Sequence, residues 1–219
     1  MTLANTQIKF CGITNYTDAK NCLDLGIHYL GFNFYKKSKR YIDPIEAKLI
    51  TRRLPANISL VGVFVNSEKA EIDKIAREVS LDTIQLHGDE DLDFCKNWNE
   101  LKIIKALRIG LHKKKDCENF LEVSDYILLD KYSSEEFGGT GKEIEEKLLK
   151  ELGEDIISKS FLSGGLTPEN VASKLQNFKP FGLDVASGIE KDNDPRSKDL
   201  TKMKGFLKAV WYYLLNITN

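Results

Sequence analysis

The sequence lacks any apolar run long enough to cross a bilayer. Its longest apolar run covers residues 209–215, far short of the roughly 20 residues that a membrane-spanning helix needs. Residues 1–5 show neither the basic nor the apolar region of a signal peptide. We therefore expect a cytoplasmic protein with no membrane partner.

An excess of charge of either sign is also missing, and cysteine is scarce. The 32 basic and 33 acidic residues give a net charge of -1, so electrostatics offers no reason to expect a nucleic-acid partner. The four cysteines include no C-x-x-C pair and no spacing with histidine that suits zinc. These absences indicate a reducing compartment and exclude disulfides and a structural metal.

What the sequence does contain is a regular alternation of short β-like runs and longer stretches of helical period. With 219 residues, 42% of them hydrophobic, and no linker, the chain is expected to form one domain over residues 1–219. The expected strands cover residues 8–11, 29–34, 60–65, 83–87, 102–107, 126–130, 160–163 and 182–186.

Eight strands that alternate with eight helices predict a single α/β domain, a (β/α)₈ TIM barrel with parallel strands. The alternative is an open doubly wound sheet, which usually carries G-x-G-x-x-G in its first turn. Here the first turn has only Gly12. Thr14 is expected to cap the first helix, the acidic residues 89–91 to begin the fourth, and Pro168 the seventh.

Several chemically active residues stand where strands are expected to end, and in a barrel these ends surround one mouth. They are Cys11, Arg40, His87, Asp130, Gly164, Gly165, Ser187 and Gly188.

The glycines after the last two strands predict a phosphate site. Gly164 and Gly165 follow the seventh strand, and Ser187 and Gly188 follow the eighth. Glycine lets backbone N–H groups approach an anion, and these two loops form the usual phosphate site of this fold. The alternative is that they are ordinary turn glycines.

Cys11 and Asp130 are candidates for proton transfer. A carboxyl group at the end of an apolar strand is partly desolvated, which favours the protonated form of a general acid. A thiol becomes a base where cationic neighbours lower its pKa. The alternatives are a buried hydrophobic thiol and a carboxylate that caps a helix or pairs with lysine.

Arg40 and His87 are candidate substrate-binding residues. Arg40 belongs to the basic run 36–40, and its planar guanidinium suits a carboxylate. The alternatives are a solvated basic loop and a histidine packed at a strand end.

The sequence resembles the phosphoribosylanthranilate isomerase family of tryptophan biosynthesis. The matching stretches lie between residues 8 and 190, in the order and spacing of the family: KFCGIT (9–14), GFNFY (31–35), SKRY (38–41), VGVFV (61–65), QLHG (85–88), LLD (128–130), GGTGK (138–142), SGGLTPENV (163–171) and DVASGIE (184–190).

The resemblance implies an Amadori rearrangement of N-(5-phosphoribosyl)anthranilate to 1-(2-carboxyphenylamino)-1-deoxy-D-ribulose 5-phosphate, without metal or other cofactor. Cys11 would be the general base, Asp130 the general acid, and Arg40 the residue that holds the anthranilate carboxylate. The remaining substrate-binding residues would be His87, Gly141, Gly164, Gly165, Asp184, Ser187 and Gly188. The partner would be a phosphorylated small molecule, and the chain a monomer or homodimer.

The sequence departs from the family at Lys39, at Glu143–Ile144 and in residues 191–196. These departures concern the shape of loops rather than the expected acid and base. Two alternatives stay open. One is the related phosphosugar isomerase of the histidine pathway, which has aspartate in both catalytic places. The other is a non-catalytic barrel that binds a phosphorylated ligand.

Overall fold

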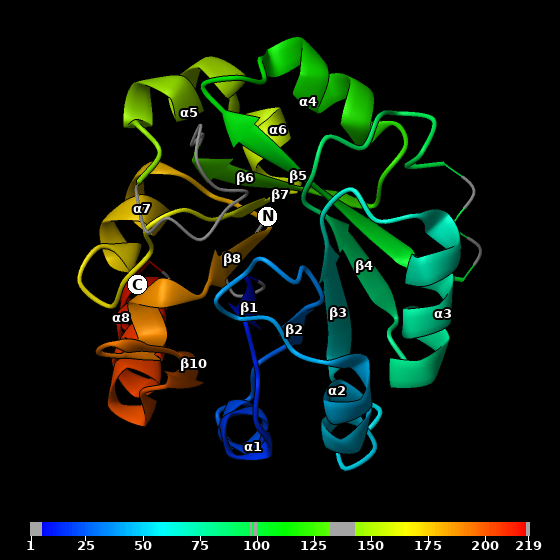
Figure 1. Cartoon of the computed structure of the whole chain (residues 1–219). Helices are drawn as coiled ribbons and strands as arrows, with labels where there is room; N and C mark the ends of the chain where they lie inside the picture. The colour runs from blue at the N-terminus through cyan, green and yellow to red at the C-terminus, as the bar shows by residue number, and fades with distance from the viewer. Residues whose placement is uncertain (1–5, 97, 99, 132–142, 218–219) are drawn as a thin grey trace.

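A computed structural model describes residues 6–96, 98, 100–131 and 143–217. Its centre is a closed barrel of eight parallel strands, in which each strand pairs with the next and the eighth pairs with the first (Figure 1). The strands are β1 (Gln7–Cys11), β2 (Tyr29–Asn33), β3 (Ser59–Phe64), β4 (Thr83–Leu86), β5 (Lys102–Ile109), β6 (Tyr126–Lys131), β7 (Ser160–Leu162) and β8 (Gly182–Val185). The predicted fold class is confirmed.

Helices surround the barrel on the outside (Figure 1). They are α1 (Tyr16–Asp24), α2 (Pro44–Thr51), α3 (Lys69–Val79), α4 (Lys114–Leu121), α5 (Glu146–Leu152), α6 (Glu154–Ile157), α7 (Val171–Asn177) and α8 (Leu200–Ile217). Among the described residues, no helix combines the length and the apolar character needed to cross a membrane.

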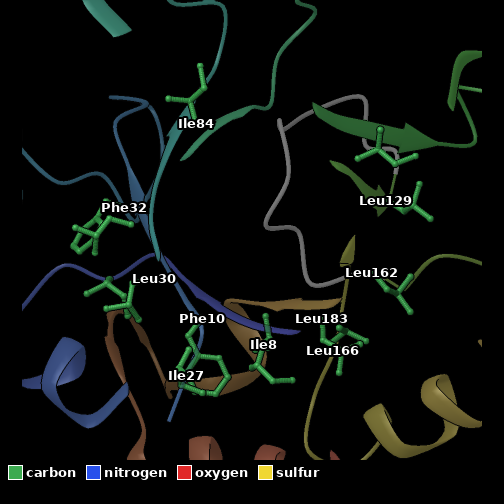
Figure 2. Packing of buried hydrophobic residues seen from close by; sticks show 14 of the residues in the cluster. Ile8, Phe10, Ile27, Leu30, Phe32, Ile84, Leu129, Leu162, Leu166 and Leu183 are labelled. Atoms are coloured by element: carbon green, nitrogen blue, oxygen red, sulfur yellow. The ribbon is translucent and has the colours of Figure 1, made fainter. Parts of the chain in front are cut away.

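The main hydrophobic core lies between the barrel and its helices. Successive side chains of a strand point to opposite faces, so Ile8 and Phe10 of β1 and Leu30 and Phe32 of β2 turn outward into this core (Figure 2). All four side chains are buried. The intervening residues of the same strands therefore line the inside of the barrel.

A second, aromatic cluster fills the barrel interior at the end where the strands begin. Tyr29 and Tyr126 each open a strand, and Phe181 directly precedes β8. The ring of Phe161 meets Tyr29 edge-on at 5.4 Å, and Tyr126 stacks on Phe181 at 4.3 Å. Such contacts add to the gain from burial, and they close this end of the barrel.

The acidic segment after β4 is not the start of a helix, so that prediction is wrong. The described residues between β4 and β5 form turns instead. The Asp91 carboxylate accepts the Phe94 N–H at 2.8 Å, and the Glu90 carboxylate pairs with buried Lys105. These side-chain bonds give the backbone an alternative to helical hydrogen bonds.

Other helix ends also differ from expectation. Asn15, not Thr14, caps α1, because its side chain accepts the Asp18 N–H at 2.9 Å. Pro168 lies in a turn, and α7 begins at Val171.

The last loop holds a small antiparallel hairpin of β9 (Glu190–Lys191) and β10 (Asp194–Lys198). This hairpin covers the atypical stretch 191–196 and brings two charged residues toward the barrel, Glu190 and Lys198, both of which are buried.

Candidate active site at the mouth of the barrel

One pocket opens at the carboxyl ends of the strands and brings most of the candidate residues together. Those that line it are Cys11, Arg40, His87, Asp130, Gly164, Gly165, Asp184 and Ser187. Gly188 is not among the lining residues, and Gly141 lies outside the described residues, as does the rest of the 138–141 loop.

Cys11 is the last residue of β1, and its thiol points into the pocket. Gly31 of the neighbouring strand makes room for it, since a Cβ at Gly31 would lie 2.7 Å from the Cys11 sulfur. Gly12 then turns the chain with φ +77°, a conformation that favours glycine. A Cβ at Gly12 would meet the Arg40 Cδ at 2.6 Å, so the glycine also admits the arginine.

Lys9 lies directly below Cys11 inside the barrel, with none of its surface exposed. Its ammonium donates to the Asp184 carboxylate at 2.6 Å, and it also interacts electrostatically with the Cys11 thiol. Burial opposes its charge, but Asp184 and Cys11 outweigh burial and raise the pKa of Lys9. The Ser163 hydroxyl donates to the other Asp184 oxygen at 3.2 Å. Asp184 thus connects β8 to β1 and to the residue that follows β7.

These neighbours do not lower the pKa of Cys11 in the free protein. A thiol is expected to act as a base only where cationic neighbours lower its pKa, and this condition is not met here. Burial raises the pKa of the Cys11 thiol, whereas Lys9 and Lys198 act in the opposite direction. The cations that favour a thiolate are therefore present, but desolvation is the larger effect.

Arg40 is held across the mouth by Glu190. Its Nε donates to one carboxylate oxygen at 2.5 Å and its Nη2 to the other at 3.0 Å. Buried Lys198 donates to the same carboxylate at 3.0 Å. Burial raises the pKa of Glu190, but Arg40 and Lys198 together outweigh it and lower the pKa. The basic run 36–40 is thus anchored at Arg40 rather than fully solvated.

Asp130, near the end of β6, faces His87, which follows β4. The His87 Nε2 lies 3.3 Å from an Asp130 oxygen, within ion-pair distance but without hydrogen-bond geometry. The His87 Nδ1 is 2.7 Å from the Gln85 side-chain nitrogen. Among the described side chains, His87 Nε2 and Gln85 Oε1 are the buried polar atoms without a hydrogen bond. Both residues line the pocket, where a ligand can satisfy them.

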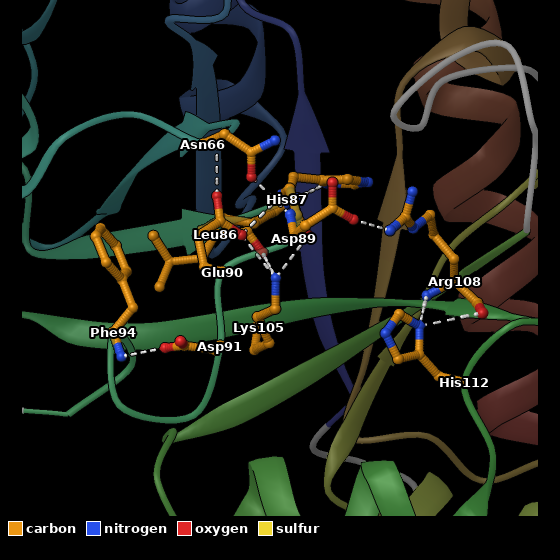
Figure 3. Close-up of polar contacts among 12 residues, drawn as sticks. Asn66, Leu86, His87, Asp89, Glu90, Asp91, Phe94, Lys105, Arg108 and His112 are labelled. Carbon is orange, nitrogen blue, oxygen red and sulfur yellow. Dashed lines mark hydrogen bonds and ion pairs between the residues drawn. The ribbon is translucent and has the colours of Figure 1, made fainter.

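The loop that carries His87 is fixed from below by Lys105 of β5 (Figure 3). The Lys105 ammonium donates to the Gly88 carbonyl at 2.8 Å and to the Glu90 carboxylate at 2.7 Å. The same carboxylate accepts the N–H groups of Asn66 and Gly88. Burying this charged pair is favourable only because it is fully hydrogen-bonded, so it holds the loop in one position.

The two glycine loops after β7 and β8 lie against each other. Gly164 and Gly165 both have positive φ, +83° and +64°. A Cβ at Gly188 would lie 1.9 Å from the Leu166 carbonyl oxygen. Gly188 therefore allows the two loops to come into contact, and it contributes to packing beside the pocket. Bare backbone at Gly164 and Gly165 suits an anion.

The sequence reasoning missed several residues of this site. Lys9 and Gln85 stand two positions before Cys11 and His87 on their strands, so period-2 alternation could have placed them inside the barrel. The sequence offered no signal for the pairing of Glu190 with Arg40, which are 150 residues apart.

A thiol and a carboxyl group thus face one pocket from β1 and β6, between an arginine and a pair of glycine loops. The arginine and the glycine loops can bind a ligand with two anionic groups. The thiol and the carboxyl group can then transfer protons at two atoms of that ligand. Within the described ranges, no cluster of three or more His, Cys, Asp or Glu side chains could hold a metal ion.

The chain is similar to known proteins over most of its length. The family model of N-(5'-phosphoribosyl)anthranilate isomerase matches residues 8–209. The enzyme of that name from Thermotoga maritima is 39% identical over 203 residues, which cover 92% of this chain and 97% of the relative. A relative from Trichlorobacter lovleyi is 37% identical over 209 residues, 92% of this chain and 96% of its own.

Solved structures show the same likeness. A crystal structure of the Thermotoga maritima enzyme superposes with a TM-score of 0.82 at 37% identity, covering 94% of this chain and 99% of that one. Another isomerase, in complex with reduced 1-(o-carboxyphenylamino)-1-deoxyribulose 5-phosphate, has a TM-score of 0.78 at 36% identity with the same coverage. The chain belongs to the N-(5'-phosphoribosyl)anthranilate isomerase family.

Proposed function

We propose that this protein isomerises N-(5'-phosphoribosyl)anthranilate to 1-(2-carboxyphenylamino)-1-deoxy-D-ribulose 5-phosphate, a step of tryptophan biosynthesis. The observation that carries the proposal is the placement of Cys11 and Asp130 in one pocket, flanked by Arg40 and the glycine loops. Relatives that carry the isomerase name match nearly the whole chain, which supports it.

The substrate has two anionic ends, and the pocket has a place for each. Its phosphate binds the backbone N–H groups of Gly164 and Gly165, with Ser187 beside them. Its anthranilate carboxylate binds Arg40, whose orientation Glu190 fixes. Holding both ends places the ribose between Cys11 and Asp130 and converts binding energy into orientation.

Two proton transfers by the protein and a final tautomerisation then complete the rearrangement. Protonated Asp130 gives its proton to the ribose ring oxygen, and the C1′–O bond breaks as the anthranilate nitrogen forms a Schiff base. The Schiff base acidifies the C2′–H, and the Cys11 thiolate removes that proton. The resulting enolamine tautomerises to the ketone, so no atom is lost and no redox partner is needed.

The chain is expected to act as a monomer or homodimer on this phosphorylated substrate. A relative from Thermotoga maritima is described as dimeric, at 37% identity and a TM-score of 0.79. Sedimentation of the purified protein decides between the two states.

The test is the loss of substrate fluorescence when purified protein is added to N-(5'-phosphoribosyl)anthranilate, with the product identified by mass spectrometry and NMR. Saturable turnover to the ketose supports the proposal. Binding without turnover would indicate a non-catalytic barrel. Turnover of the histidine-pathway bisphosphate alone would assign the protein to that reaction instead.

A further inference from the structure

We propose that Lys9 is a positioning residue that stabilises the thiolate of Cys11, with Asp184 as the counter-charge that limits this effect. The inference rests on the proposed role of Cys11 as base and adds the residues that set its charge.

The geometry of β1 brings the two side chains together. Lys9 and Cys11 are two positions apart on one strand, so both point into the barrel. Asp184, opposite Lys9 in the register of β1 and β8, accepts a hydrogen bond from the Lys9 ammonium at 2.6 Å. The same ammonium acts electrostatically on the Cys11 thiol. The Cys11 thiol thus follows a buried ion pair, Lys9–Asp184, on the same face of β1.

Lys105 shows what a buried lysine with a purely structural task looks like in the same barrel. Its ammonium binds the carbonyl oxygens of Leu86 and Gly88 as well as Glu90, and so fixes a loop. Lys9 instead donates to Asp184, which lies on a strand that the backbone ladder already holds against β1. The other group that interacts with its charge is the Cys11 thiol. Burying a lysine and its partner carboxylate costs free energy even when the two are paired. Because Lys9 does not fix a loop as Lys105 does, its position next to the Cys11 thiol indicates another role.

The charges around Cys11 agree with a thiolate. The groups on this side of the mouth are three cations and two carboxylates, which leave one positive charge: Lys9, Arg40, Lys198, Asp184 and Glu190. Asp130 and His87 face the pocket from the other side. A thiolate at Cys11 would balance the excess. Burial raises the pKa of Cys11, and Lys9 is the strongest influence in the opposite direction.

The test measures the rate of Cys11 alkylation by iodoacetamide from about pH 7 to about pH 11, around the ordinary thiol pKa of about 8.5. Mass spectrometry reads the labelled peptide, which separates Cys11 from the other three buried thiols. The midpoint of the pH curve reports the charge on Cys11, and the limiting rate at high pH reports its accessibility. The variants are Lys9→Met and Asp184→Asn, with Lys105→Met as the matched buried-lysine control.

We expect Lys9→Met to move the midpoint upward by about one pH unit, a loss of about tenfold in alkylation rate at fixed pH below it. Asp184→Asn should move the midpoint downward, because the ammonium then acts on the thiol alone. Lys105→Met should leave the midpoint unchanged even if it lowers stability.

Opposite shifts in the two variants exclude a merely structural role, because loosening the site would change the limiting rate of both in one direction. Unchanged midpoints, or shifts of the same sign, would overturn the proposal. If Lys9→Met does not fold, Asp184→Asn alone decides: an unchanged or raised midpoint contradicts the account. Alkylation does not require turnover, so failure of the proposed enzymatic function would appear separately in the fluorescence assay.

Discussion

The two ends of the barrel interior are built from the same strands but differ in chemistry. On β7, Phe161 faces the closed end and Ser163 follows at the mouth. On β6, Leu128 is part of the aromatic cluster's packing, and Asp130 lines the pocket. On each of these strands, two positions along the chain therefore separate a residue of the apolar cluster from a polar residue at the mouth.

This contrast shows how the fold divides its tasks. The closed end, around Tyr29 and Phe161, gains stability from burial and ring contacts and needs no solvent access. The mouth gathers charges that are costly to bury, and it holds them through pairs such as Lys9–Asp184 and Arg40–Glu190. We therefore expect substitutions at the mouth to impair turnover and those at the closed end to impair stability.

The largest effect is expected at the two proton-transfer groups. Cys11→Ser and Asp130→Asn should each lower kcat by about a hundred- to ten-thousandfold, with a much smaller change in KM, because each removes a positioned base or acid. Steady-state kinetics measures both. Cys117→Ser, a buried thiol on α4, is the control and should keep its kcat. Near-wild-type turnover in Cys11→Ser would leave Cys11 a packed thiol and redirect the search for the base to His87.

At the closed end, Phe161→Ala should lower the free energy of unfolding by about 3–5 kcal/mol, the usual cost of removing a buried phenyl ring. The folded fraction should retain its kcat and KM. Urea unfolding followed by kinetics below the transition measures both quantities, and Phe161→Leu should cost less. A loss of kcat without a loss of stability would break the division between the two ends.

The phosphate loop should show an effect on binding. Gly165→Asp places a carboxylate beside the expected phosphate and should raise KM by about ten- to a hundredfold, equivalent to about 1.5–3 kcal/mol for lost charged hydrogen bonds. Gly165→Ala is the control for backbone strain at φ +64° and should raise KM less. A KM of Gly165→Asp that is unchanged from the wild type would show that the anion binds elsewhere.

The smallest effect concerns the thiols outside the mouth. Burial raises the pKa of Cys95 to about 11 and that of Cys117 to about 12. The folded state therefore holds these protons more tightly than the unfolded state, and stability is lost as pH rises above the ordinary thiol pKa of about 8.5. At about pH 10, each thiol should cost about 1–2 kcal/mol of unfolding free energy.

Urea unfolding at about pH 8 and about pH 10 measures this loss. Cys95→Ala should show a smaller decrease between the two pH values than the wild type. A wild-type stability that does not change over this range would contradict the assigned burial of the thiols.

Local sequence patterns were sufficient to predict the barrel, because strand alternation and strand-end residues repeat with a short period. They placed Cys11 and Asp130 at strand ends, where the structure brings both to one pocket. These patterns failed where residues far apart in the sequence determine the local structure. Glu90 pairs with Lys105 instead of starting a helix, and Lys9 pairs with Asp184, 175 residues away. No local propensity encodes such pairs.

We expect one ligand to span this mouth from Arg40 to the glycine loops, with its reacting carbon beside Cys11. The most direct test is a crystal structure of this protein with reduced 1-(o-carboxyphenylamino)-1-deoxyribulose 5-phosphate. We predict the phosphate at the N–H groups of Gly164 and Gly165, the carboxylate at Arg40, and C2′ in contact with the Cys11 sulfur. A phosphate bound away from these loops, or a ribose that touches neither Cys11 nor Asp130, would contradict the account.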